Sequence, residues 1–195
     1  MIGCGIKKIR GPTVCSKIWS LPATQRIHVS FNKHEQPDGP NVSNCTNFLG
    51  TIARNGRMAP LTYIDWKALP KPCKDDMWIA IREKFDVNHG NKDWVFKSIG
   101  KKWKDWKFEL KHNRYKIHNT NEERLKDLDI RVVPKQWSIL VSYWNSLEGK
   151  EQCKTGKDNR ALQRLNHTAG SKSFAQICRE KVDWQEVRWG GAIQN

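Results

Sequence analysis

The stretch from Trp94 to Lys111, WVFKSIGKKWKDWKFELK, constrains the fold most because its apolar residues recur at the period of an α-helix. Its large apolar residues follow one another at steps of four, four, three and four. At about 100° per residue they fall within an arc of about 80°, which is one stripe of an amphipathic helix. The stretch therefore predicts a helix with one face in a hydrophobic core. The stripe consists of Val95, Ile99, Trp103, Trp106 and Leu110.

Lysines occupy the remaining sides of the same predicted helix. Four of them project away from the apolar stripe and two lie on its flanks. The four are Lys97, Lys101, Lys104 and Lys111, and the two are Lys102 and Lys107. A row of ammonium groups on a rigid rod is a surface that a polyanion can follow. The same helix is therefore expected to have a core face and a basic face.

Three further residues bear on how this helix starts, packs and meets solvent. Asn91 offers an N-cap, and Gly100 is expected to permit close approach by another helix. Phe108 projects among the lysines. It either packs on a second element or offers a stacking surface to a nucleobase, and the sequence leaves both alternatives open.

The rest of the pattern predicts a mainly α protein, an irregular multi-helix domain with a small N-terminal β-hairpin. Alternation over Arg26–Phe31 predicts a strand, which we expect to pair with residues near Lys17–Leu21. Helices are predicted over 43–55, 62–69, 73–85, 120–128 and 134–149. Their start and stop signals are Thr62, Pro72, Pro134, the Thr120–Glu123 capping box, and Gly56 and Gly149 at the ends.

The region after residue 149 has a different composition. Basic residues recur there at helical steps, with few large apolar ones, so we expect a marginal helix over 150–166. Ser171 is expected to cap a final helix that carries Phe174, Ile177 and Cys178. The expected organisation is an N-terminal tail and hairpin (1–40), a Trp-rich helical core (41–149), a basic helical segment (150–182) and a tail (183–195).

Charge and cysteine usage narrow the functional classes. The 195 residues include 35 Lys and Arg against 20 Asp and Glu, a formal charge of +15, and clustered cations favour a nucleic-acid partner. The six cysteines form no CxxC pair, which favours reduced, structural thiols over a zinc site. The N-terminus has no secretory h-region, and no apolar run reaches about 18 residues. A soluble, intracellular protein without a membrane partner is expected.

No motif for catalysis or cofactor binding is found. The sequence has no HExxH, GxSxG, GxGxxG or GxxxxGK[ST] pattern, and TAGSKS lacks the strand and helix that flank a nucleotide loop. A two-metal nuclease site needs converging carboxylates, whereas the pair Asp105 and Glu109 lies where ion pairs with lysine are expected. We therefore expect no catalytic residues, metal, cofactor or small-molecule substrate.

Two functional hypotheses follow. The first is DNA binding, mostly to duplex, in which basic side chains contact phosphates and supply affinity more than sequence readout. Its candidate residues are Lys97, Lys101, Lys102, Lys104, Lys107, Lys111, Arg114, Lys154, Lys157, Arg160, Arg164 and Lys172. The alternative is a protein-interaction module in which the Trp-rich stripe and Phe108 dock a partner chain.

Several stretches in order resemble the plant transposase family of the Ptta/En/Spm (CACTA-like) type. They are RGPT with Ile18 and Trp19, FLGTIARNGRMAPLTYIDWKALP, DDMWIAIREKFDV, WVFKSIGKKWKDWK, VPKQWSILVSYWNS and NHTAGSKSFAQ. The resemblance covers about residues 9–180, and the segment after Lys181 departs from it. It implies a transposon-derived, nuclear, DNA-associated protein, with other transposase subunits as further partners. The matching positions are Gly100, Lys101, Lys102, Trp103, Trp106 and Lys107, then Gly170, Ser171, Lys172, Ser173 and Phe174.

Overall fold

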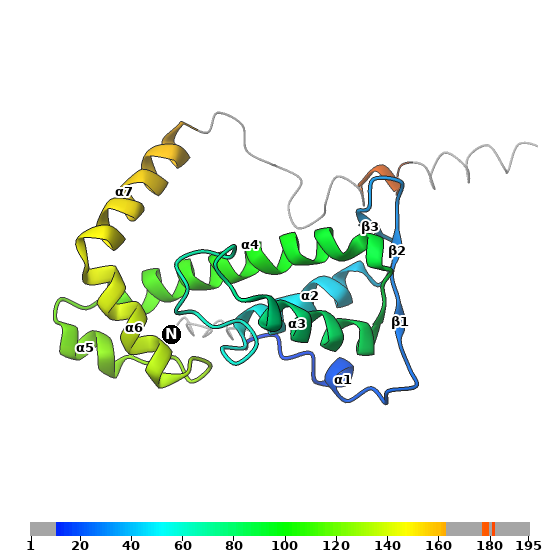
Figure 1. Cartoon of the computed structure of the whole chain (residues 1–195), viewed down its shortest axis with the longest axis horizontal. Coiled ribbons are helices and arrows are strands. Elements are labelled where there is room, and N and C mark those ends of the chain that lie inside the picture. Colours follow the sequence, from blue (N-terminus) through cyan, green and yellow to red (C-terminus); the bar gives the residue numbers. More distant parts are fainter. Residues whose placement is uncertain (1–10, 163–176, 180, 182–195) are drawn as a thin grey trace, which may run out of the picture.

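The computed structural model describes residues 11–162, 177–179 and 181, and it confirms a mainly helical protein with two small two-stranded sheets (Figure 1). The long helix runs through the middle of the molecule. The helices are α1 (Ser16–Trp19), α2 (Val42–Arg54), α3 (Lys71–Lys84), η1 (His89–Asn91), α4 (Lys92–Leu110), η2 (Lys111–Tyr115), α5 (Asn121–Lys126), α6 (Pro134–Asn145) and α7 (Leu147–Ala161). The strands are β1 (Ile27–His28), β2 (Ser30–Phe31), β3 (Pro37–Asp38) and β4 (Phe85–Asp86).

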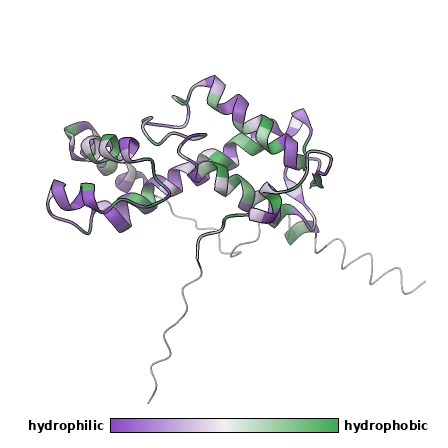
Figure 2. Ribbon diagram, turned by 90° about the horizontal axis from the view of Figure 1, so that it is seen from below, coloured by the Kyte–Doolittle hydropathy of each residue, from purple (hydrophilic) through white to green (hydrophobic). Residues whose placement is uncertain are grey.

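The core forms chiefly where α2 packs against α4. All five residues of the predicted α4 stripe are at most 2% exposed, and Phe48, Leu49 and Ile52 of α2 are fully buried against them. Trp137 and Trp144 of α6 extend the same cluster past the end of α4. Figure 2 shows hydrophobic and hydrophilic residues alternating along the helical ribbons, as expected when one side of a helix is buried. The predicted helical period therefore identified the core correctly.

The N-terminal strands pair differently from the prediction. Residues near Lys17 form the short helix α1, so the predicted hairpin partner of residues 26–31 is wrong. Instead, β1 pairs in parallel with β4, and β2 pairs antiparallel with β3. The β2–β3 hairpin closes because the Asn32 side chain accepts hydrogen bonds from the backbone N–H groups of His34 (2.9 Å) and Gln36 (3.1 Å). The partner of β1 is distant in sequence and could not be identified from local alternation, whereas β3 lies only a short turn after β2.

The helix predicted over 62–69 is not formed, and this segment consists of turns. Asp65 does not complete a capping box; its carboxylate accepts a hydrogen bond from the backbone N–H of Ala68 (2.8 Å), which closes a local turn. The segment places Trp66 directly against Gly100 of α4, where an added Cβ would lie 2.8 Å from the indole. Gly100 thus permits close approach, as predicted, but of a side chain from a loop and not of a helix.

Gly56 also acts differently from the prediction. It does not adopt a left-handed backbone, and α2 ends at Arg54 with Asn55 as its C-cap. The Gly56 carbonyl accepts a hydrogen bond from the Gln136 side chain (2.7 Å), which in turn accepts one from the backbone N–H of Leu61 (3.1 Å). Gln136 of α6 thereby attaches the segment after α2 to the C-terminal helices.

The predicted helix over 134–149 is divided into two. Helix α6 ends at Asn145, and the Ser146 hydroxyl caps α7 by accepting a hydrogen bond from the backbone N–H of Gly149 (3.1 Å). Leu147 is therefore 74% exposed and does not belong to the buried stripe. An added Cβ at Gly149 would collide with the Tyr143 carbonyl oxygen, so the residue serves the close crossing of the two helices.

Helix α7 extends away from the body of the molecule (Figure 1). It packs mainly on α6, and of its residues only Gly149 is buried. The part of the basic segment that the structure describes is thus helical, as expected, up to Ala161, and residues 163–166 of the predicted helix lie outside the described residues. Of the predicted final helix, Ile177 and Cys178 have helical backbone, whereas Ser171 and Phe174 lie outside the described residues.

Candidate nucleic-acid interface

The basic face of α4 is built from three exposed lysines. Lys97, Lys101 and Lys104 follow one another at steps of four and three along the side opposite the core stripe. Among the residues that the structure describes, no carboxylate oxygen lies within 4.0 Å of their ammonium groups. The ion pairs expected from Asp105 and Glu109 are also absent there. The three charges consequently remain hydrated and available to a polyanion.

The other three lysines of the predicted face are half-buried. Lys107 lies over the ring of Trp103, with its Nζ 4.4 Å from the ring centroid, and donates a hydrogen bond to the Tyr63 carbonyl (2.7 Å). Burial lowers the pKa of Lys107 to about 8, although the charge of Asp65 opposes the shift. Burial also lowers the pKa of Lys102, assisted by the charge of Lys101. Lys107 therefore holds the loop that covers α4 and is poorly placed to reach a phosphate.

Lys111 marks the point where α4 passes into η2 and meets α7. Its Nζ lies 5.5 Å from the Trp144 ring centroid. Burial lowers the pKa of Lys111, and the charges of Lys116 and Lys157 lower it further. Cations from α7 and from the end of η2 therefore converge on one region. Lys116 is exposed and was not selected from the sequence, although it lies one turn beyond Lys111.

Helix α7 supplies a second exposed basic row. Lys154, Lys157 and Arg160 are all exposed, and a helical projection places them within an arc of about 120°. The acids Glu151 and Asp158 lie outside that arc. Arg164 and Lys172, which were also predicted to contact DNA, lie outside the described residues. The part of the basic segment that is described thus presents cations on one side.

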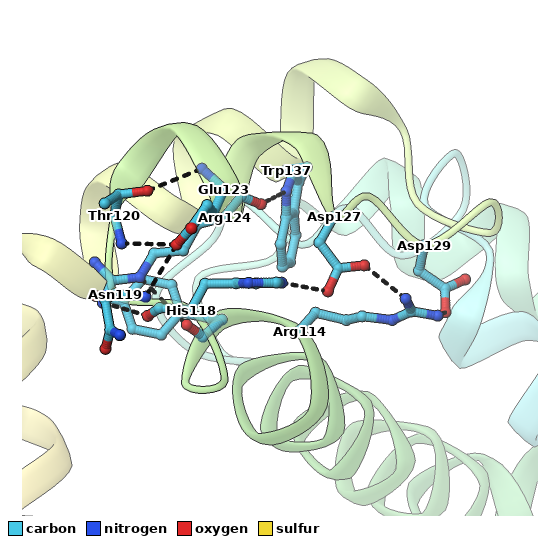
Figure 3. A network of polar contacts seen from close by, with 10 residues as sticks. Arg114, His118, Asn119, Thr120, Glu123, Arg124, Asp127, Asp129 and Trp137 are labelled. Carbon is cyan, nitrogen blue, oxygen red and sulfur yellow. Dashed lines mark hydrogen bonds and ion pairs between the residues drawn. The ribbon is translucent and has the colours of Figure 1, made fainter.

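Arg114 has a different environment from the other candidates. It donates a hydrogen bond to Asp127 (2.6 Å) and lies 3.8 Å from Asp129 (Figure 3). Burial would raise the pKa of Asp127, but hydrogen bonds from His118 and Arg114 outweigh this and lower it. Arg131 pairs with Asp129 through two hydrogen bonds of 2.8 Å. Two carboxylates therefore neutralise these arginines, which makes Arg114 a structural residue in this conformation.

The same network connects α5 to the core. The Thr120–Glu123 capping box forms as predicted, and the Arg124 carbonyl accepts a hydrogen bond from the Trp137 indole (2.8 Å; Figure 3). Arg124 also stacks on Tyr115, with its guanidinium carbon 4.4 Å from the ring centroid. A shallow pocket beside the network is lined by Arg114 and Arg131 but also by Glu109 and Asp129. Its mixed charge does not favour an anion.

The structure brings Phe108 to the surface of the basic face. Its side chain is 66% exposed, so most of the ring is open to solvent and is not buried against a second element. Its ring stacks on the imidazole of His112, with centroids 6.0 Å apart and planes 11° from parallel. By contrast, Trp103, Trp106, Trp137 and Trp144 are at most 5% exposed. The tryptophans that would form a docking surface are therefore used in the core.

Metal-binding clusters and membrane-spanning helices are two further features that would indicate a function. Across the described residues, no three His, Cys, Asp or Glu side chains come together in a way that could hold a metal ion. In the same part of the chain, no helix has the length and hydropathy needed to cross a membrane.

Comparison with known proteins identifies one family. The family model described as plant transposase (Ptta/En/Spm family) matches residues 133–187, a range that contains α6 and α7. The match extends to residue 187, so the predicted departure from the family after Lys181 is wrong for residues 182–187. No curated protein and no solved structure matches the chain. Residues 133–187 thus carry the sequence pattern of the Ptta/En/Spm plant transposase family.

Proposed function

We propose that this chain is a transposon-derived DNA-binding protein that contacts phosphates through the exposed lysine row of α4. The single observation that carries the proposal is the row itself: Lys97, Lys101 and Lys104 are exposed and unpaired with carboxylates in the described chain. The net charge of +15 and the family match support it, since a transposase acts on DNA. DNA is the partner, and the nucleus is the expected location.

Helix α7 provides the second part of the proposed interface. Lys154, Lys157 and Arg160 extend the basic surface, and Lys111 and Lys116 lie where α7 and α4 meet. Arg164 and Lys172 keep their predicted role at the end of this segment. Lys102 and Lys107 are partly covered and are proposed to contribute less. The proposed role is binding by phosphate contacts, without strand cleavage by this chain alone.

The alternative is a protein-interaction module that uses the Trp-rich helical surface. The burial of Trp103 and Trp106 in the core counts against it, because these side chains are unavailable to a partner. Salt dependence separates the two functions. Phosphate contacts release counterions, so log K falls by about 0.9 for each contact per log unit of salt, whereas an apolar interface shows a shallow dependence.

The test compares two variants of equal charge. One variant replaces Lys97, Lys101 and Lys104 with Gln. The control variant replaces three exposed lysines on other elements with Gln, namely Lys33, Lys126 and Lys135. Fluorescence anisotropy with labelled duplex DNA is measured over a salt series. We expect the α4 variant to reduce the slope of log K against log salt by about 2.7, and the control to leave it nearly unchanged.

Two results would contradict the proposal. If both variants weaken binding equally, affinity follows net charge and not the α4 row. If neither variant changes it, the exposed lysine row of α4 does not contact DNA. Circular dichroism of each variant verifies that helicity is retained.

A further inference from the structure

Phe108 is a large apolar side chain on the most basic side of the longest helix. It is 66% exposed, whereas the apolar stripe of α4 is fully covered by α2, α6 and the 62–69 segment. The ring is therefore not a core residue displaced to the surface. Scattered surface hydrophobics are ordinary, so exposure alone does not indicate a function. The groups around the ring, however, do indicate one.

The orientation of the Phe108 ring is held by a neighbour. His112 lies four residues later, in the first turn of η2, and its imidazole is nearly parallel to the ring at an interplanar angle of 11°. His112 is itself exposed. The two rings form an offset stack that leaves most of Phe108 open to solvent. A third flat group can extend such a stack without rearranging the helix.

The lysine row leads directly to this stack. Lys104 lies four residues before Phe108 and Lys101 lies seven before it, so all three share one side of α4. One turn of helix rises about 5.4 Å, which places an ammonium group about one turn from the ring. The acids Asp105 and Glu109 project to one side of the lysine row and not between its members. A basic track beside an aromatic platform is the arrangement by which proteins hold single-stranded nucleic acid.

We propose that Phe108, oriented by His112, stacks on an unpaired base of a DNA strand whose phosphates contact Lys101 and Lys104. This inference rests on the proposed function and adds its substrate class, which is single-stranded DNA. In an intact duplex both faces of each internal base are covered by neighbouring bases. The ring gains a stacking partner only when a base is free.

The experiment uses the full chain and one DNA sequence of about 20 nucleotides, single-stranded and as a blunt duplex. Affinities are measured by fluorescence anisotropy at low salt for wild type, Phe108→Ala and Phe108→Trp. A control variant, Ile79→Ala, removes an exposed apolar side chain (57% exposed) from α3. Base stacking on an aromatic side chain predicts a roughly 5- to 150-fold loss of single-strand affinity in Phe108→Ala. Duplex affinity should change less than about twofold.

Phe108→Trp should retain single-strand binding, and Ile79→Ala should resemble wild type. Photo-cross-linking of a strand that contains 4-thiothymidine should label the peptide that includes Phe108. An equal loss on both DNAs, or no loss on either, overturns the inference, as does a label confined to other peptides. These results leave the proposed function intact if the Lys97, Lys101 and Lys104 variant still weakens binding. If that variant has no effect, the proposed function fails as well.

Discussion

Replacing Gly100 with Ala tests the account of how the flank of α4 is covered. A Cβ at this position would lie 2.8 to 2.9 Å from three atoms of the Trp66 indole. Carbon atoms pack at about 3.5–4.0 Å, so the ring would have to retreat by roughly 1 Å. The ring is also held by Trp103, at a centroid distance of 5.9 Å, and by Lys74, whose Nζ lies 5.9 Å from its centroid.

Two effects of this substitution oppose one another. Ala is favoured over Gly within a helix by about 1 kcal/mol. Overpacking a filled site costs about 1–3 kcal/mol. The clash should prevail, which makes Gly100→Ala destabilising by roughly 1 kcal/mol. In a Trp66→Ala background the obstacle is gone, so the same substitution should increase stability by about 1 kcal/mol.

The assay is urea unfolding of wild type, both single variants and the double variant, followed by circular dichroism. The expected coupling between the two positions is about 1–3 kcal/mol, with a change of sign for Gly100→Ala. A substitution that stabilises the wild type as much as the Trp66→Ala protein would refute the reasoning. That result would mean that Gly100 is not needed for the close approach of Trp66. The 62–69 segment would then not restrict the basic face to Lys97, Lys101 and Lys104.

Two further predictions concern titratable groups. Because the pKa of Lys107 is lowered to about 8 in the folded state from an ordinary value near 10.5, the unfolded chain binds more protons between these values. The free energy of unfolding should therefore rise with pH across that window, and urea titrations should show a smaller rise in Lys107→Met. The hydrogen bond from Arg131 lowers the pKa of the Asp129 carboxyl, so its contribution is present at neutral pH and is lost as pH falls below the ordinary Asp value. Asp129→Asn should cost roughly 1–3 kcal/mol at neutral pH, and the difference from wild type should shrink in acid; a difference independent of pH would contradict this.

Local pattern was sufficient for the elements whose signals lie within a few residues. The 3.6-residue period from Val95 to Leu110 identified α4 and its buried face, because periodic burial is a property of the helix itself. The capping box at Thr120 and the prolines that open α3 and α6 were likewise read correctly. Hydrogen bonds and backbone restrictions of this kind involve neighbours in the chain, so the local sequence is sufficient to predict them.

Burial by distant segments was decided only by the tertiary structure. Helical spacing predicted that both Lys97 and Lys111 project away from the apolar stripe. In the structure, Trp144 and α7 half-cover Lys111, whereas Lys97 is exposed. Likewise, the 62–69 segment had a helical signal, but Asp65 closes a local turn and Trp66 packs on Gly100. Helical projection gives the direction of a side chain from its own axis. Whether another part of the chain already occupies that direction depends on contacts between residues far apart in sequence, which no local spacing records.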